Sequence, residues 1–103
     1  MKILRNSYLS LGTNLGNKLE NLQKCINLVD DTIGAVKKIS SVYSSEAWGF
    51  KSDTFLNICI KISTSLNPED LLAGLHSIEK ELGRIRNTNN KYSARTIDID
   101  ILL

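Results

Sequence analysis

The segment FLNICIKIS at residues 55–63 has the clearest strand pattern in the sequence. Four aliphatic residues stand at every second position: Leu56, Ile58, Ile60 and Ile62. Side chains alternate between the two faces of a strand, so one face is aliphatic and the other carries Phe55 and Asn57. The segment therefore predicts a strand with one face on a hydrophobic core and the other face open.

Helix patterns flank this strand on both sides. Downstream, Asn67 is a helix cap, followed by a proline at the first helical position and two acids at the positive end of the helix dipole. Gly83 ends this helix. Upstream, apolar residues recur at steps of three and four, which indicates an amphipathic helix that stops at Gly34 and has Asn14 and Asn17 as candidate caps. This apolar stripe comprises Leu15, Leu19, Leu22, Ile26, Val29 and Ile33.

Three more segments have strand character. Residues 8–11 predict a short strand that Gly12 ends, residues 36–43 are rich in β-branched residues, and residues 96–102 alternate again. Residues 44–54 are polar and predict a loop. The order βαββαβ, with one aliphatic face per strand, predicts a ferredoxin-like α+β sandwich whose antiparallel sheet is covered by helices on one face.

The composition is that of one small globular domain. The chain has 103 residues, of which 42% are hydrophobic and 23% charged, and this suits a single domain over residues 1–103. Its net charge of +2 is too small to indicate a nucleic-acid or membrane partner by itself. No apolar run approaches the roughly 20 residues of a membrane span, and the N-terminus has no signal-peptide pattern, so we expect a cytoplasmic protein. Cys25 and Cys59 form no metal or redox motif and predict free thiols.

Asp98 and Asp100 are the strongest candidates for a metal site. Strand geometry puts them on one face, with Cα atoms roughly 6.5–7 Å apart. Two like charges this close repel each other unless a cation neutralises them, and magnesium suits because it takes a few carboxylates and then substrate phosphates. The alternative for such a pair is the solvated outer face of an ordinary strand.

A basic, irregular segment precedes the two aspartates. Its cationic residues are Arg84, Arg86, Lys91 and Arg95. Arginine binds phosphate oxygens through a planar fork, and cations beside paired acids suit a nucleotide triphosphate and its metal. A solvated basic loop that only balances nearby acids is the alternative. The glycines near residue 12 lack the lysine and the spacing of a P-loop, so phosphate binding must use side chains and metal.

Phe55 and Asn57 are candidates for binding a flat heterocycle, because an aromatic side chain can stack while an amide bonds a ring edge. Packing under the 44–54 loop, or an ordinary polar surface, are the alternatives. Trp48 is interpreted as a lid over the site or as a plug that anchors its loop. His76, the single histidine, has no partner for a catalytic triad and is expected on a helix surface.

Several segments, in order along nearly the whole chain, resemble the 6-hydroxymethyl-7,8-dihydropterin pyrophosphokinases of folate biosynthesis. They are YLSLGTNLG at 8–16, FLN at 55–57, TSL at 64–66 with EDLL at 69–72, IE at 78–79 with LGR at 82–84, and RTIDIDIL at 95–102. The last is the most specific. The resemblance implies a magnesium-dependent transferase that moves pyrophosphate from ATP to a hydroxymethyl pterin and releases AMP.

The same resemblance implies a role for each matching position. Asp98 and Asp100 would hold two magnesium ions, and together with Arg84 and Arg95, which would grip the phosphates, they would be the catalytic residues. The pterin would contact Ser45, Glu46, Trp48, Phe55 and Asn57. ATP would contact His76, Glu79, Arg84, Arg86, Tyr92, Arg95 and Ile101.

The chain also departs from the family pattern. The family usually has Trp-Gly-Pro where residues 92–94 read Tyr-Ser-Ala, and often has a proline where Glu46 stands. It also continues well past residue 103 with further ATP contacts, so we interpret the chain as C-terminally truncated. Two alternatives stay open: a catalytically silent fragment, or a small-molecule or RNA-binding module on the same fold. We expect a monomer.

Overall fold

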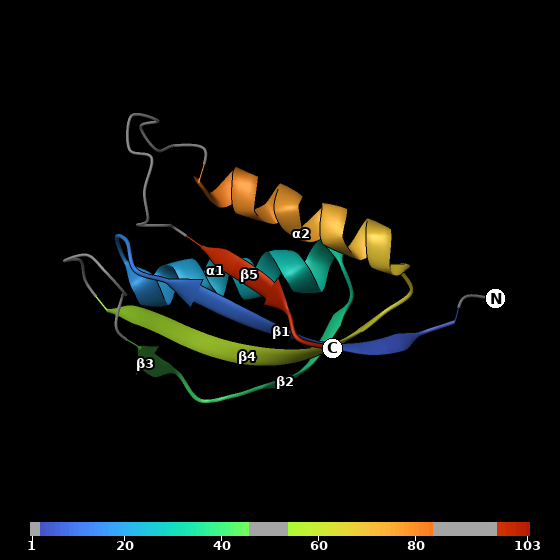
Figure 1. The fold of residues 1–103 in the computed structure, drawn as a ribbon, viewed down its shortest axis with the longest axis horizontal. Coiled ribbons are helices and arrows are strands. Elements are labelled where there is room, and N and C mark those ends of the chain that lie inside the picture. Colours follow the sequence, from blue (N-terminus) through green and yellow to red (C-terminus); the bar gives the residue numbers. More distant parts are fainter. Residues whose placement is uncertain (1–2, 46–53, 84–96) are drawn as a thin grey trace.

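A computed structural model describes residues 3–45, 54–83 and 97–103 of the chain. Within these ranges the chain forms seven elements, shown in Figure 1: β1 (Arg5–Thr13), α1 (Lys18–Thr32), β2 (Ala35–Ile39), β3 (Tyr43–Ser45), β4 (Phe55–Thr64), α2 (Pro68–Gly83) and β5 (Asp98–Ile101). The sheet is antiparallel and has the strand order β2-β4-β1-β5, with β3 also pairing with β4. Neither described helix is long and apolar enough to cross a membrane. The predicted ferredoxin-like α+β arrangement is confirmed.

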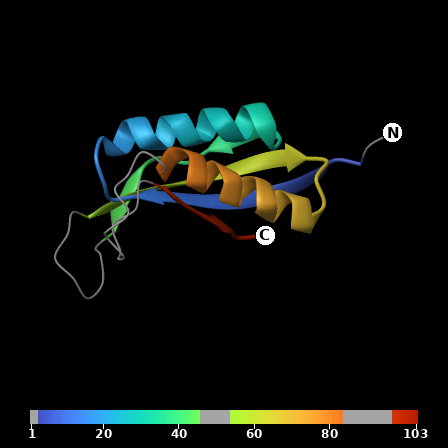
Figure 2. The ribbon, with the colours of Figure 1, turned by 90° about the horizontal axis from the view of Figure 1, so that it is seen from above.

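The hydrophobic core lies on one face of the sheet, between the sheet and the two helices. Every second residue of the central strands is buried there, for example Leu9 and Leu11 in β1 and Ile60 and Ile62 in β4. The helices contribute a further buried set: Leu22, Cys25, Ile26 and Val29 from α1, and Leu71, Leu75 and Ile78 from α2. Figure 2 shows both helices running along the strands. Since each buried aliphatic side chain stabilises the fold by about 1.5–3 kcal/mol, this face holds the structure and leaves the other face free for chemistry.

Side-chain caps fix where both helices begin. Asn17 Oδ1 accepts the Glu20 amide at 3.1 Å, and Asn67 Oδ1 accepts the Asp70 amide at 2.8 Å. Asn17 and Asn67 are therefore confirmed as caps, whereas Asn14 is buried. The predicted apolar stripe is wrong at two positions: Leu15 precedes α1, which starts only after Asn17, and Leu19 in its first turn is 61% exposed.

Two predicted strands also have different bounds in the structure. β1 begins at Arg5 rather than Tyr8, and it does not stop before Gly12 but runs through it to Thr13. The predicted strand over residues 36–43 is divided into β2 and β3, so that Ser45, expected in a loop, lies in a strand. The pairing becomes irregular at Ser40: its amide still donates to the Cys59 carbonyl at 2.9 Å, but the Cys59 amide donates to the Ser40 hydroxyl at 2.9 Å.

The two cysteines are free thiols in different environments. Cys25 lies on α1 in the core, where burial and, secondarily, the negative charge of Glu79 raise its pKa to about 12. Cys59 lies on β4 and is half-buried. At neutral pH Cys25 is therefore an un-ionised, inert core residue.

Candidate functional site

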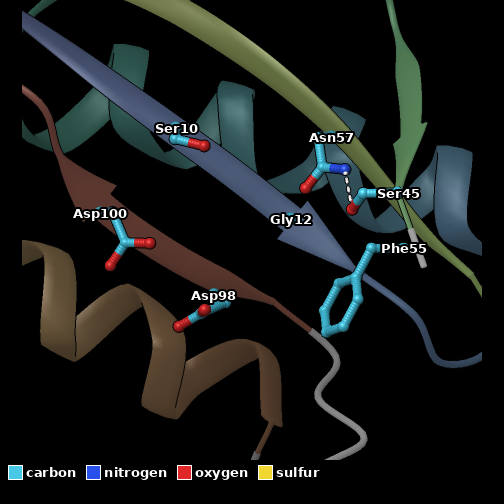
Figure 3. Close-up of a pocket in the computed structure, with 7 residues that line it drawn as sticks. All are labelled: Ser10, Gly12, Ser45, Phe55, Asn57, Asp98 and Asp100. Atoms are coloured by element: carbon cyan, nitrogen blue, oxygen red, sulfur yellow. Dashed lines mark hydrogen bonds between the residues drawn. The ribbon is translucent and has the colours of Figure 1, made fainter. Parts of the chain in front are cut away.

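A polar pocket lies on the open face of the sheet, opposite the core (Figure 3). It encloses about 200 Å³ and draws its walls from four strands. The lining residues are Ser10 and Gly12 of β1, Ser45 of β3, Phe55 and Asn57 of β4, and Asp98 and Asp100 of β5. Five of these seven were predicted as site residues from the sequence.

The sheet register explains why these residues meet. Gly12 pairs with Asn57 on one side and with Asp98 on the other, so the three form one row across β4, β1 and β5. Ser10 pairs with Asp100 in the next row of the same face. Neighbouring strands are about 4.8 Å apart, so the β4 and β5 side chains face each other across β1 at a distance of roughly 10 Å.

Gly12 keeps the floor of this pocket low. A Cβ atom at this position would lie 2.9 Å from Asn57 Oδ1 and 3.6 Å from Phe55 Cδ1. Any larger residue would therefore push against the Asn57 amide, touch the Phe55 ring and take up part of the pocket floor. A glycine inside a strand often marks such a close approach, and this is the physical reason for Gly12 here.

On the β5 side, two carboxylates project from one face of the strand (Figure 3). Asp98 is half-buried and Asp100 is exposed. In the described ranges no three His, Cys, Asp or Glu side chains come together as a ready-made metal cage. Two carboxylates in an open polar pocket fit a hard cation that keeps water or takes substrate oxygens as its other ligands, which is the way magnesium usually binds.

On the β4 side, the side chain of Asn57 is held in one orientation. Its Nδ2 donates to Ser45 Oγ at 2.9 Å and, more weakly, to the Tyr43 carbonyl at 3.5 Å (Figure 3). The amide oxygen is thereby turned toward Gly12 and the centre of the pocket. Beside it, the half-buried ring of Phe55 offers a flat apolar surface. Together they can stack on a planar ring and bond its edge.

The polar face continues beyond the pocket along β1 and β4. Lys61 Nζ lies 5.9 Å from the ring centroid of Tyr8, a favourable cation–π arrangement. The Tyr43 hydroxyl contacts Cys59 Sγ at 3.6 Å, and this hydrogen bond raises the pKa of Tyr43. None of these four side chains lines the pocket.

Three predicted ATP contacts lie outside the pocket. His76 is exposed on α2, as expected. Glu79, also on α2, is half-buried, and its Oε2 accepts a hydrogen bond from the Ile99 amide at 2.8 Å. Ile101 lies on β5, pairs with Leu9 and is 38% exposed. The remaining predicted site residues fall outside the described ranges: Glu46, Trp48, Arg84, Arg86, Tyr92 and Arg95.

Sequence reasoning missed two residues of the pocket. Ser10 and Gly12 alternate with the buried Leu9 and Leu11, so the period of two in β1 already placed them on the open face. Gly12 was interpreted as the end of the strand. The contacts that require a glycine here are with residues of β4, across the sheet, and the sequence around Gly12 does not show them.

Comparison with known proteins supports one family. Residues 8–103 match the family model described as 7,8-dihydro-6-hydroxymethylpterin-pyrophosphokinase. A protein of Aquifex aeolicus called 2-amino-4-hydroxy-6-hydroxymethyldihydropteridine pyrophosphokinase is 43% identical over 97 residues, which cover 93% of this chain and 59% of that protein. Proteins of the same description are 41% identical in Porphyromonas gingivalis (93% of this chain, 67% of that protein) and 38% identical in Bacillus subtilis (94% and 58%). The chain thus spans about three fifths to two thirds of the length of these relatives.

Proposed function

The chain belongs to the 7,8-dihydro-6-hydroxymethylpterin-pyrophosphokinase family, and from this premise we propose that it transfers pyrophosphate from ATP to 6-hydroxymethyl-7,8-dihydropterin. The activity stated in the names of its relatives supports the reaction, which would serve folate biosynthesis. One observation carries the proposal at the level of residues: a flat aromatic and a fixed amide face two carboxylates across a glycine floor in one pocket. Neither the family match nor the relatives favour an RNA-binding module.

The β4 side of the pocket is the proposed pterin site. Phe55 would stack on the bicyclic ring, while the Asn57 amide oxygen would accept from a ring N–H group. Ser45 supports this recognition, because its hydroxyl already holds the amide nitrogen. The ring would then lie over Gly12, with its hydroxymethyl group directed toward β5.

The β5 side is the proposed magnesium and phosphate site. Asp98 and Asp100 would hold the cation through their carboxylate oxygens; two ions, as the family resemblance implies, remain a prediction. When bound, magnesium would neutralise charge on the phosphate oxygens of ATP and orient them. Arg84 and Arg95, outside the described ranges, are proposed to grip the same phosphates from the segment that precedes β5.

In the proposed reaction, the pterin hydroxymethyl oxygen attacks the β-phosphorus of ATP in line. A bond forms between that oxygen and the β-phosphorus, the bond from the β-phosphorus to the bridging α–β oxygen breaks, the hydroxyl proton passes to solvent, and AMP leaves. The contribution of the chain is mainly positioning, since a phosphoryl-type transfer requires reactants to be aligned and charge to be neutralised rather than a protein nucleophile.

The test is magnesium-dependent formation of AMP from ATP and 6-hydroxymethyl-7,8-dihydropterin, followed by chromatography, together with calorimetric binding of a non-hydrolysable ATP analogue. Asp98→Asn and Asp100→Asn should each lower the rate at least 100-fold and leave the fold intact. Asp31→Asn is the matched control, because Asp31 is an exposed carboxylate on α1. A chain that neither forms AMP nor binds the analogue in the presence of magnesium would contradict the proposal.

A cytoplasmic location and a monomeric state belong to the same proposal. Both are expected of a small enzyme that acts on two soluble substrates. Size-exclusion chromatography with light scattering tests the second: a mass near 11.5 kDa agrees with a monomer, and a doubled mass refutes it.

A further inference from the structure

Glu79 of α2 forms a hydrogen bond to β5, the strand that carries the two aspartates of the pocket. Its Oε2 accepts the backbone amide of Ile99 at 2.8 Å. Ile99 stands between Asp98 and Asp100, the two carboxylates of the pocket. The bond joins helix α2 directly to the peptide unit between Asp98 and Ile99, in the segment that carries both aspartates.

The direction of the Ile99 amide follows from the sheet. β5 ends the strand order β2-β4-β1-β5, so one of its edges pairs with β1, and no strand of the described residues lies beside the other edge. The Leu102 amide donates to the Tyr8 carbonyl at 2.7 Å, which sets the alternation along β5. In an antiparallel pair, the backbone N–H and C=O groups of every second residue point toward the paired strand. Those of Asp98 and Asp100 therefore point toward β1, while the Ile99 amide points to the outer edge. Glu79 supplies its acceptor there.

The contact restrains β5 from both sides. The Ile99 side chain is 7% exposed and packs into the core, and its amide is tied to Glu79. Glu79 is itself half-buried, and its Oε2 is directed at the Ile99 amide. A rotation of the Ile99 peptide would turn the flanking aspartates, because they share its backbone.

We propose that Glu79 is a positioning residue that sets the direction of the Asp98 and Asp100 carboxylates and so the affinity of the pocket for a divalent cation. The inference rests on the proposed metal-binding function of these aspartates. It assigns Glu79 a partner within the chain, distinct from the ATP contact that the family resemblance implies. Cation affinity then depends on the Glu79 hydrogen bond and on a side chain long enough to make it, rather than on its negative charge.

Three substitutions of Glu79 separate the effect of its side-chain length from the effect of its negative charge. Glu79→Gln keeps an oxygen at the same distance and removes the charge, Glu79→Asp keeps the charge and withdraws the oxygen by one methylene, and Glu79→Ala removes both. Glu81→Ala is the matched control, because Glu81 is exposed on the same helix. The readouts are Mn²⁺ binding by electron paramagnetic resonance, amide exchange of Ile99 by NMR, and pterin binding.

Glu79→Asp and Glu79→Ala should each weaken Mn²⁺ binding about tenfold and speed Ile99 exchange, with pterin affinity unchanged. Glu79→Gln and Glu81→Ala should stay within threefold of the parent chain. If Glu79→Ala does not fold, Glu79→Asp decides the question by the same comparison.

Three results would overturn the inference. Parental Mn²⁺ affinity in Glu79→Asp, with faster Ile99 exchange, would mean that the bond only ties β5 down. Equal losses in Glu79→Gln and Glu79→Asp would mean that a general disturbance of α2 is responsible. A parent chain that binds no Mn²⁺ would refute the proposed metal site itself and this inference with it, which separates the two failures.

Discussion

Gly12→Ala should weaken ligand binding while leaving the fold nearly as stable as before. Gly12 lies in the middle of the pocket floor, paired with Asn57 and Asp98. The added methyl group would start 2.9 Å from Asn57 Oδ1, a distance that real Cβ atoms essentially never show. The amide must therefore retreat by a few tenths of an ångström, and its hydrogen bond to Ser45 at 2.9 Å opposes that movement.

Gly12→Ala changes the free energy of unfolding through two contributions of opposite sign. Replacing glycine by alanine within a strand is favourable by about 0.5–1 kcal/mol, which offsets about 1 kcal/mol for a strained or lost hydrogen bond. The free energy of unfolding should thus change by less than about 1 kcal/mol. A ligand that needs the Asn57 oxygen in its present place loses one hydrogen bond, about 1–1.4 kcal/mol, which corresponds to roughly five- to tenfold weaker binding.

Fluorescence titration with 6-hydroxymethylpterin and urea unfolding measure the two quantities separately. Gly83→Ala is the matched control, since a Cβ at Gly83 would have no atom of the described residues within 4 Å. It should leave the pterin Kd unchanged. If the Gly12→Ala variant is correctly folded and its Kd for the pterin is unaltered, the ring does not lie over Gly12 beside Asn57. The assignment of the pterin site would then have to be abandoned.

Two further predictions concern stability. Asn67→Ala removes the cap that accepts the Asp70 amide and should lower the free energy of unfolding by about 1 kcal/mol in urea titrations without affecting pterin binding; an unchanged midpoint would mean that the cap contributes nothing. The pKa of Cys25 is raised in the folded chain from 9.0 to about 12, so the protonated thiol stabilises the fold fully below pH 9, and this contribution is lost as pH rises from 9 toward 12. Between pH 8 and pH 10.5, the free energy of unfolding measured in urea should fall more in the parent than in Cys25→Ala. Equal decreases would refute the raised pKa of Cys25.

Local chemistry was sufficient to predict much of the fold. The alternation over residues 55–63 gave the buried and open faces of β4, and Asn67 gave the start of α2, because both depend only on neighbours along the chain. The division into β2 and β3 could not be foreseen, since the pairing becomes irregular at the bonds between Ser40 and Cys59, which are 19 positions apart.

The candidate site was predictable in parts and not as a whole. Alternation placed Asp98 and Asp100 on one face of their strand and Asn57 on one face of another. That these faces meet depends on β1 lying between β4 and β5, and strand order is a tertiary property. The bond from Glu79 to Ile99, between a helix and an edge strand, has no pattern in the sequence at all.

Asp98 and Asp100 are proposed to bind a divalent cation, across the pocket from Asn57. Paramagnetic broadening of amide NMR signals by Mn²⁺, added with a non-hydrolysable ATP analogue, tests it directly. The amides of residues 98–100, and those of Ser10 and Gly12 beside them in the sheet, should lose intensity first. Broadening centred on the exposed acids of α1 or of the first turn of α2, with residues 98–100 unaffected, would contradict the claim.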